Sequence, residues 1–305
     1  MKDENRIVHT VWIGKRFSML ECLTVRLLQK HGHEVHLWAY EKIDNVPERV
    51  IIEDAALVMP KDTIFRYAGK PFNGIPNDGI GSFSHWSDQF QMKLLYKYGG
   101  IYLQLDVSCL KPLDFEQPYV FFPIGEQGIQ TCLMKLPQGS AFAEECDKAL
   151  HKEINRDTIA SLDWFCSLRL ITHVLRKHKL YKTEFILPEK NILDLGGNIK
   201  SGPFYENVII PEDVCIIHWS NATNFENKDY PLPGSVYECL LKEAGIIKRF
   251  NYIKRLFVFY PKRLIKLLNI RNIPHLVIKI IHSWKKVGFE ITVRRIINYI
   301  RYGKA

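Results

Sequence analysis

The chain has 305 residues, of which 47% are hydrophobic and 25% are charged, and this composition indicates a globular protein with a sizeable core. Its net charge of +9 is unevenly distributed, because fifteen of the 42 Lys and Arg residues follow residue 244. Seven widely spread cysteines without a C-x-x-C pair exclude a zinc cluster and a disulfide framework, so we expect reduced thiols and a cytoplasmic protein.

The N-terminal part of the chain predicts alternating strands and helices followed by a loop. Apolar runs predict strands over residues 8–13 and 35–39, and a helix over residues 19–31 joins them as a crossover. Residues 48–59 have a helical pattern. Residues 61–84 contain four glycines and two prolines, so we expect a long loop, of the kind that covers a ligand or shapes a binding site.

A helix, a tight turn and a strand are expected next. Ser87 and Asp88 can cap a helix whose apolar residues recur at three- and four-residue spacing. Gly99 and the glycine after it fit a left-handed C-terminal cap. The residues from 101 to 107 then read as one mostly apolar strand.

Asp106 ends this apolar strand, and Gln104 lies two residues earlier on the same face. In open α/β sheets, ligands bind outside the carboxyl ends of the strands. An aspartate there can hold a cation and the phosphates that the cation neutralises. The alternative is an ordinary turn residue, but a polar pair within a core-like strand needs partners once it is buried, which favours a functional interpretation.

The second half continues the alternation and completes an α/β fold. We expect strands over residues 119–122, 132–136, 185–187 and 214–219, and helices over residues 141–154 and 161–179.

The run SDQFQMKLLYKYGGIYLQLDVSCLKPL, residues 87–113, resembles the DXD-containing sugar transferases of glycosyltransferase family 32 and the related capsular polysaccharide synthesis proteins. Weaker similarity is visible in HTVWIG at residues 9–14, SGP at 201–203 and IIHW at 216–219. The resemblance implies a GT-A fold, with a Rossmann-like mixed sheet flanked by helices. It also implies a nucleotide-sugar donor, a divalent metal, usually manganese, and retention of anomeric configuration.

The chain departs from the family pattern at two positions. Gln104 stands where the family has the first Asp of the motif, and Gln91 stands where it commonly has Arg. In similar transferases the second acid binds the metal, which implies that role for Asp106, and the first binds ribose or sugar hydroxyls. A glutamine amide can still make hydroxyl contacts. Together, the two departures remove one negative and one positive charge, so the net charge of the site is unchanged if the residues lie close together.

The resemblance also assigns His9, Thr10 and Trp12 to nucleotide binding, with the Trp12 ring stacking on the base. A tryptophan in a first strand is as often part of the core. Ser87 and Asp88 would complete the donor site together with Gln91 and Gln104, and Asp88 would contact the donor ribose or sugar.

His218 follows an apolar strand and is the candidate to complete the metal or diphosphate site opposite Asp106, although a single histidine at a strand end can equally be structural. By similarity, Ser201 and Gly202 would lie near the acceptor or the transferred sugar. They can also be read as a plain turn.

These residues predict a hexosyltransferase that moves a sugar from a UDP-sugar to a glycan or lipid-linked acceptor, in capsule, O-antigen or lipopolysaccharide synthesis. A Mn²⁺ or Mg²⁺ ion at Asp106 would stabilise the negative charge of the leaving diphosphate. Because the motif reads Gln-Leu-Asp, the alternative is a non-catalytic protein that binds sugar nucleotides.

The charge distribution predicts a catalytic domain over residues 1–244 and a basic amphipathic helical region over residues 245–305. The second part has fifteen basic residues and one acid, Glu290, which leaves a net charge of −5 for the first part. Such helices fit an anionic membrane surface, at the inner face of the plasma membrane, or a cap packed on the catalytic domain. Nucleic-acid binding ranks lowest because no recognition module is present. We expect neither a signal peptide nor a membrane span.

Overall fold

The computed structural model describes residues 1–71, 79–125, 128–195, 208–220, 228–229, 231 and 234–247. The chain divides into two compact units, Met1–Ile246 and Ile247–Ala305. The predicted basic helices of the C-terminal region therefore lie outside the described residues.

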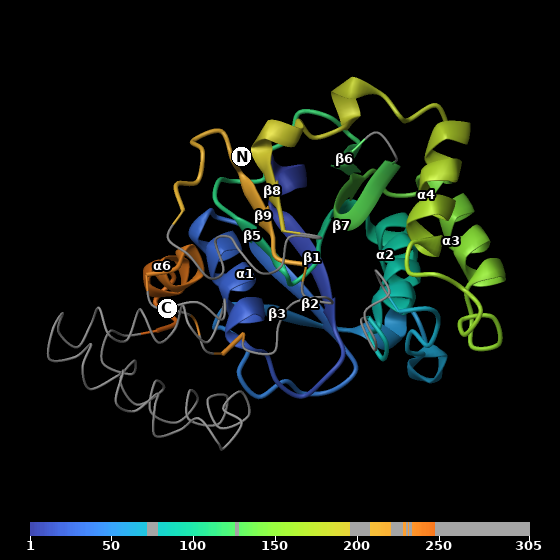
Figure 1. Cartoon of the computed structure of the whole chain (residues 1–305), viewed down its shortest axis with the longest axis horizontal. Coiled ribbons are helices and arrows are strands. Elements are labelled where there is room, and N and C mark those ends of the chain that lie inside the picture. Colours follow the sequence, from blue (N-terminus) through green and yellow to red (C-terminus); the bar gives the residue numbers. More distant parts are fainter. Residues whose placement is uncertain are drawn as a thin grey trace, which may run out of the picture. The chain divides into compact units, whose positions relative to one another are not determined.

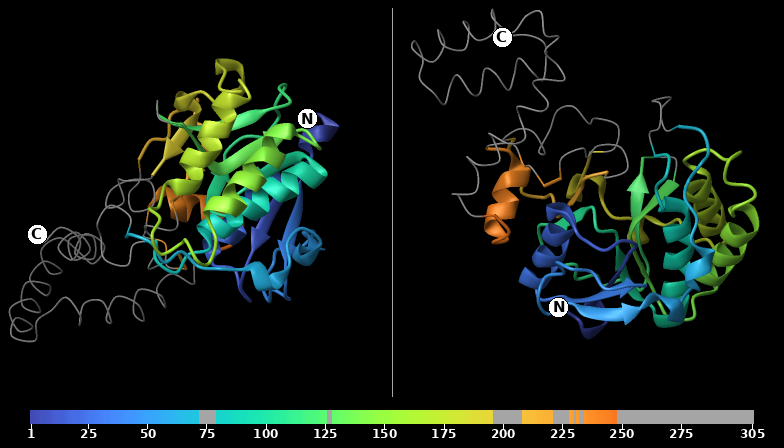
Figure 2. Two further views of the ribbon diagram at one scale, coloured as in Figure 1. Left: turned by 90° about the vertical axis from the view of Figure 1, so that its right-hand side faces the viewer. Right: turned by 90° about the horizontal axis from the view of Figure 1, so that it is seen from below.

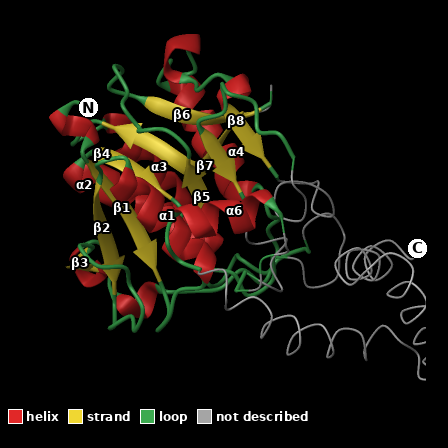
Figure 3. Ribbon diagram, turned by 90° about the vertical axis from the view of Figure 1, so that its left-hand side faces the viewer, coloured by secondary structure: helices red, strands yellow, loops and turns green. Residues whose placement is uncertain are grey.

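A six-stranded mixed sheet forms the centre of the first unit, in the order β3-β2-β1-β4-β7-β6 (Figure 3). The strands are β1 (Ile7–Trp12), β2 (Glu34–Ala39), β3 (Ile51–Asp54), β4 (Gly100–Leu103), β6 (Val120–Ile124) and β7 (Gly128–Leu136). Strands β1 to β4 run parallel to one another, whereas β7 pairs antiparallel with β4 and with β6. The predicted α/β fold with a mixed sheet flanked by helices is confirmed.

A second, three-stranded sheet has the order β5-β9-β8. Its strands are β5 (Val107–Cys109), β8 (Ile192–Asp194) and β9 (Ile216–His218). Strand β5 follows β4 after only three residues, so the chain passes from the large sheet into the small one at residues 104–106.

Helices cover the large sheet on both faces (Figures 1 and 2). Helices α2 (Ser84–Tyr98), α3 (Ala141–Glu153) and α4 (Cys166–Lys177) pack on one face, and α1 (Met19–Lys30) packs on the other beside β5. The described helices also include α6 (Val236–Glu243), and short 3-10 turns occur at Asp3–Asn5, Ala55–Leu57, Lys61–Thr63, Thr183–Phe185 and Glu189–Asn191. The two faces bury separate apolar clusters, one around Trp86 and Phe90 and one around Val35 and Leu103.

Local sequence accounts for the ends of several helices. Ser18 forms a capping box with Glu21 at the start of α1, and the Ser140 side chain accepts from the Ala143 amide at the start of α3. Gly99 ends α2 at the predicted place with a φ of 67°, which favours glycine, but its ψ of −161° lies outside the left-handed helical region, so the predicted left-handed cap is not formed.

Two predicted elements are wrong, and a third is shorter than predicted. Residues 48–59 contain strand β3 and a 3-10 turn instead of a helix, because Ile51 and Ile52 pair with β2 and β-branched residues suit that pairing. Residues 185–187 form no regular strand and make one isolated bridge, between Ile186 and Phe121, and the strand of this region is β8. The predicted helix over 161–179 begins only at Cys166.

The Ser87 to Val107 stretch also differs from its prediction at both ends. Helix α2 begins at Ser84, so Ser87 and Asp88 lie inside the helix and do not cap it. The Ser87 hydroxyl donates instead to the Ser84 carbonyl (2.7 Å). The single predicted strand is divided at Gln104 into β4 and β5.

None of the helices in the described ranges has the length and apolar character needed to cross a membrane.

Candidate functional site

The turn between β4 and β5 carries the candidate metal ligand. The Thr24 hydroxyl donates to the Leu105 carbonyl (2.8 Å), and the Trp219 amide donates to the Asp106 carbonyl (2.9 Å). The backbone N–H of Gln104 donates to the Cys132 carbonyl on β7 (2.8 Å). Groups from α1, β7 and the end of β9 therefore fix the position of the Asp106 backbone.

A cavity of about 260 Å³ opens at this turn, slightly below the usual range of small-molecule sites, roughly 300–1,000 Å³. Four of the predicted site residues line it: Asp88, Gln104, Asp106 and His218. They come from α2, from the β4–β5 turn and from β9, so the fold brings together residues up to 130 positions apart. Further lining residues are His85, Thr131, Trp164, Phe165, Ser167 and Asp194.

Asp106, His218 and Asp194 form a row across one wall of the cavity. The His218 Nδ1 atom lies 2.9 Å from Asp194 Oδ1, and its Nε2 atom lies 3.7 Å from Asp106 Oδ2. The Gln130 amide donates to the other Asp194 oxygen (2.6 Å). Asp194 therefore fixes the imidazole so that Nε2 faces Asp106.

The two carboxylates change the protonation of His218. Burial alone would lower the pKa of this imidazole, but the hydrogen bond to Asp194 and the charges of Asp106 and Asp194 outweigh it, so the pKa is raised above 6.5. A cation that binds Nε2 has to displace a proton from it.

The donor set at Asp106 and His218 fits a divalent cation. An ion about 2.1 Å from each ligand atom can join two atoms up to about 4.2 Å apart, and Asp106 Oδ2 and His218 Nε2 are 3.7 Å apart. Within the described ranges, no group of three His, Cys, Asp or Glu side chains is arranged to hold a metal ion. The protein side chains described here thus offer two ligands, and the others would come from a bound diphosphate and water.

Gln104 lies on the same side of the turn as the cavity and is half-buried. Its Nε2 atom donates to the Thr131 hydroxyl on β7 (3.3 Å). The Gln91 side chain, in contrast, does not line the cavity. It is fully buried, and neither amide atom has a hydrogen-bond partner among the described residues.

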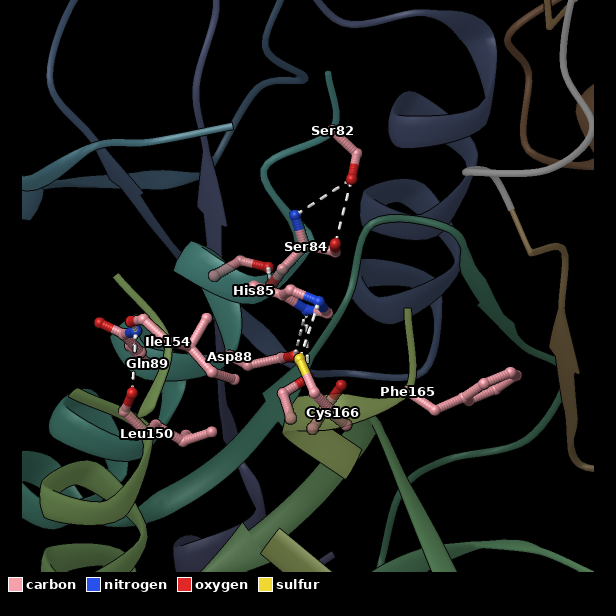
Figure 4. A network of polar contacts seen from close by, with 12 residues as sticks. Ser82, Ser84, His85, Asp88, Gln89, Leu150, Ile154, Phe165 and Cys166 are labelled. Atoms are coloured by element: carbon pink, nitrogen blue, oxygen red, sulfur yellow. Dashed lines mark hydrogen bonds and ion pairs between the residues drawn. The ribbon is translucent and has the colours of Figure 1, made fainter. Parts of the chain in front are cut away.

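A second polar group joins the first turns of α2 and α4 (Figure 4). Ser167 donates a short hydrogen bond to Asp88 Oδ2 and lies 3.3 Å from His85 Nδ1. The Cys166 sulfur lies 3.3 Å from His85 Nε2. All four side chains are buried, and His85, Asp88 and Ser167 also line the cavity.

The predicted nucleotide contacts of β1 lie elsewhere. His9, Thr10 and Trp12 are not among the residues lining the cavity. His9 is buried and accepts from Trp38 Nε1 (3.2 Å), and burial together with the charge of His36 lowers its pKa to about 4. The Trp12 ring packs edge-on against Phe17. Nucleotide binding by these residues and by Ser87, which also lies off the cavity, stays a prediction.

Ser201 and Gly202 lie outside the described residues. The prediction that they approach the acceptor or transferred sugar is therefore untested.

Asp194 and His85 line the cavity but were not predicted from the sequence. Asp194 ends the apolar strand β8 as Asp106 follows the apolar strand β4, so the same strand-end pattern could have identified it. His85 precedes the Ser-Asp pair by two residues but gives no local signal, because its partners on α4 are 81 and 82 residues away.

Comparison with known proteins gives one family match. The family model described as "Glycosyltransferase sugar-binding region containing DXD motif" matches residues 41–123, a range that includes Asp88, Gln104 and Asp106. The match indicates a sugar-binding region of the glycosyltransferase type. No curated protein matches the chain.

Two solved structures are similar at low identity. The structure described as "PaToxG Glycosyltransferase" is 15% identical, covers 57% of this chain and 68% of its own, and has a TM-score of 0.38. A structure described as a transferase mutant is 12% identical, covers 59% of this chain and 87% of its own, and has a TM-score of 0.36.

Proposed function

We propose that the protein is a glycosyltransferase that moves a hexose from a nucleotide sugar, a UDP-sugar by resemblance, to a glycan or lipid-linked acceptor. The observation that supports this most strongly is the shared cavity of Asp88, Gln104, Asp106 and His218, at the carboxyl end of β4. Ligands of open α/β sheets bind at such an edge. The match of residues 41–123 to a sugar-binding region agrees with this proposal.

The residues of the cavity divide the binding of the donor between them. Asp106 and His218 would hold a divalent cation, Mn²⁺ or Mg²⁺, and with it the diphosphate. When bound, the cation supplies charge stabilisation to the leaving nucleoside diphosphate. Asp88 and Gln104 would bind hydroxyl groups of the ribose or sugar, because a carboxylate accepts and an amide both accepts and donates hydrogen bonds.

In the proposed reaction, the protein holds the donor and excludes water, and a basic side chain is not required. For transfer with retention, the acceptor hydroxyl attacks from the face of the leaving group and passes its proton to a phosphate oxygen. We therefore assign no general base to the chain. The contributions of its residues are orientation and electrostatic stabilisation.

A thermal-shift screen tests the proposal. Ligands that bind only the folded state raise the melting temperature, so UDP-glucose, UDP-galactose and their N-acetyl forms are compared with and without MnCl₂. We expect one or more to stabilise the protein only when Mn²⁺ is present, and Asp106→Asn to abolish that shift. No stabilisation by any nucleotide sugar would contradict the proposal.

A second candidate function is favoured by Gln104 and its contact with Thr131. An amide in place of the first acid of the motif is compatible with a protein that binds sugar nucleotides without transferring the sugar. Transfer or donor hydrolysis that depends on both Mn²⁺ and Asp106 would exclude it. Donor binding without either reaction would favour it.

The proposed pathway is the synthesis of a cell-surface polysaccharide, such as capsule, O-antigen or lipopolysaccharide. Residues 245–305 support this proposal through their composition, since basic amphipathic segments bind anionic membranes, where lipid-linked acceptors are found. A truncated variant ending at Ala244 should no longer sediment with vesicles containing anionic lipid. If it sediments as well as the full chain, the C-terminal region is not the membrane anchor.

A further inference from the structure

His85 is a buried ionisable side chain in the wall of the cavity that the proposed transfer does not use. It comes from the first turn of α2, and the beginning of α4 lies against it (Figure 4). Its ring is 2% exposed. The Tyr67 ring meets its edge at 5.0 Å between centroids, and the Trp164 ring lies at 5.9 Å. The imidazole is therefore enclosed and cannot turn freely.

Both ring nitrogens of His85 are used within the protein. Nε2 lies 3.3 Å from the Cys166 sulfur, and Nδ1 lies 3.3 Å from the Ser167 hydroxyl oxygen. A protonated imidazole donates from both nitrogens. When Nδ1–H donates to Ser167, the Ser167 hydrogen is directed away from His85 and toward Asp88 Oδ2, to which Ser167 donates.

The groups around His85 favour its protonated form. Burial opposes protonation, but interactions with the Asp88 carboxylate and the Cys166 sulfur outweigh it and raise the pKa of His85 to about 9. The facing ionisable groups are Asp88 on α2, Cys166 on α4 and Tyr67 in the segment before α2. Burial raises the pKa of Tyr67 to about 12, so its hydroxyl stays neutral at physiological pH.

The arrangement leaves one oxygen of Asp88 for a ligand. Among the described residues, the hydrogen bond and the ion pair of its carboxylate both use Oδ2, through Ser167 and His85. Asp88 lines the cavity. Oδ1 can thus accept a hydrogen bond from a bound molecule while Oδ2 fixes the orientation of the carboxylate.

We propose that His85 is a positioning residue, which acts through Ser167 to hold the Asp88 carboxylate in place for the hydroxyl groups of a donor sugar. The inference rests on the proposed function, because it assumes that the cavity binds a nucleotide sugar. His85 itself makes no hydrogen bond to the sugar, since both of its nitrogens have partners within the protein.

Two substitutions separate the two nitrogens of His85. The amide nitrogen of His85→Asn lies near the position of Nδ1, so this variant keeps a donor toward Ser167. The amide nitrogen of His85→Gln lies near the position of Nε2 and keeps a donor toward Cys166. Lys93→Gln is the matched control, because Lys93 also lies on α2, and it joins that helix to α3 through Asp147 (2.8 Å) away from the cavity.

The affinity of each variant is measured by calorimetric titration in the presence of Mn²⁺. The ligands are UDP and the UDP-sugar that best stabilises the wild type. Loss of a hydrogen bond to a charged group reduces affinity by roughly ten- to a hundredfold. We expect the affinity of His85→Gln for the UDP-sugar to fall by that factor, and its affinity for UDP to fall by less than about threefold. His85→Asn should recover most of the loss at pH 7, and Lys93→Gln should bind both ligands as the wild type does.

The pH dependence gives a second readout. The preference of the wild type for the UDP-sugar over UDP should decline as the pH is raised from 7 through 9, and in His85→Asn it should be constant. A purely structural role predicts equal losses for UDP and the UDP-sugar, or none. Either result, or a pH-independent preference in the wild type, would overturn the proposal.

Crystal structures of the unliganded wild type and His85→Gln separate this inference from the proposed function. We expect Asp88 Oδ2 to remain against Ser167 in the wild type and to leave it in the variant. If no UDP-sugar binds the wild type, the proposed function fails while the crystal structures still test the positioning. An unchanged Asp88 in His85→Gln would refute the role of His85 whatever the ligand.

Discussion

The raised pKa of His85 makes a quantitative prediction about stability. Its pKa is about 9 in the folded protein, against 6.5 for an unperturbed histidine. Because the folded value is the higher one, the stabilisation is fully present below pH 6.5 and is lost as the pH rises through 9. A pKa difference of about 2.5 corresponds to roughly 3 kcal/mol of stability.

Urea unfolding of the wild type and His85→Gln at pH 6, 7.5, 9 and 10 tests this prediction. We expect the wild type to be more stable by up to about 3 kcal/mol at pH 6, and the difference to shrink steadily above pH 6.5. Ionisation at high pH of groups that do not contact His85 affects both proteins equally and cancels in the difference. A difference that stays constant with pH, or grows, would refute the assignment of a protonated His85.

Substitutions at three further positions test two other residues of the cavity and the buried side chain of Gln91. Asp194→Asn removes the carboxylate behind His218, the proposed metal ligand. Since such outer partners typically contribute about 10- to 100-fold to metal affinity, Mn²⁺ titration in the presence of UDP should show a loss of that size. Unchanged affinity would exclude the role of Asp194. Gln104→Ala should abolish transfer while Gln104→Asp remains active, and a fully active Gln104→Ala would rule out a hydroxyl contact. Gln91→Leu should raise the free energy of unfolding by about 1–3 kcal/mol, because it removes a buried amide without partners. If urea unfolding shows that Gln91→Leu is no more stable than the wild type, the Gln91 amide has hydrogen-bond partners in the folded protein.

The parts of the fold that could be predicted from the sequence are those with strong local patterns. The α/β alternation, the helix at residues 19–30 and the glycine that ends α2 follow from apolar spacing and backbone preference. The strand-end rule also identified Asp106, which the fold places in one cavity with Asp88, Gln104 and His218.

The rest depends on contacts between distant segments. Residues 51–54 became a strand because β2 offers an edge for pairing, which a local helical pattern does not reveal. The break at Gln104 marks a transfer between two sheets, and nothing in an apolar run of seven residues specifies which sheet each half joins. The role of His85 depends on α4, whose first residues lie about eighty positions later in the chain.

Binding of a UDP-sugar to the wild type and to Asp106→Asn, titrated with and without Mn²⁺, tests the central claim most directly. We predict tight binding by the wild type only with Mn²⁺, and a loss of that metal-dependent affinity in Asp106→Asn, because this substitution removes the carboxylate that would hold the cation. Equal Mn²⁺-dependent affinity in the two proteins would contradict the assignment of this cavity as the donor site.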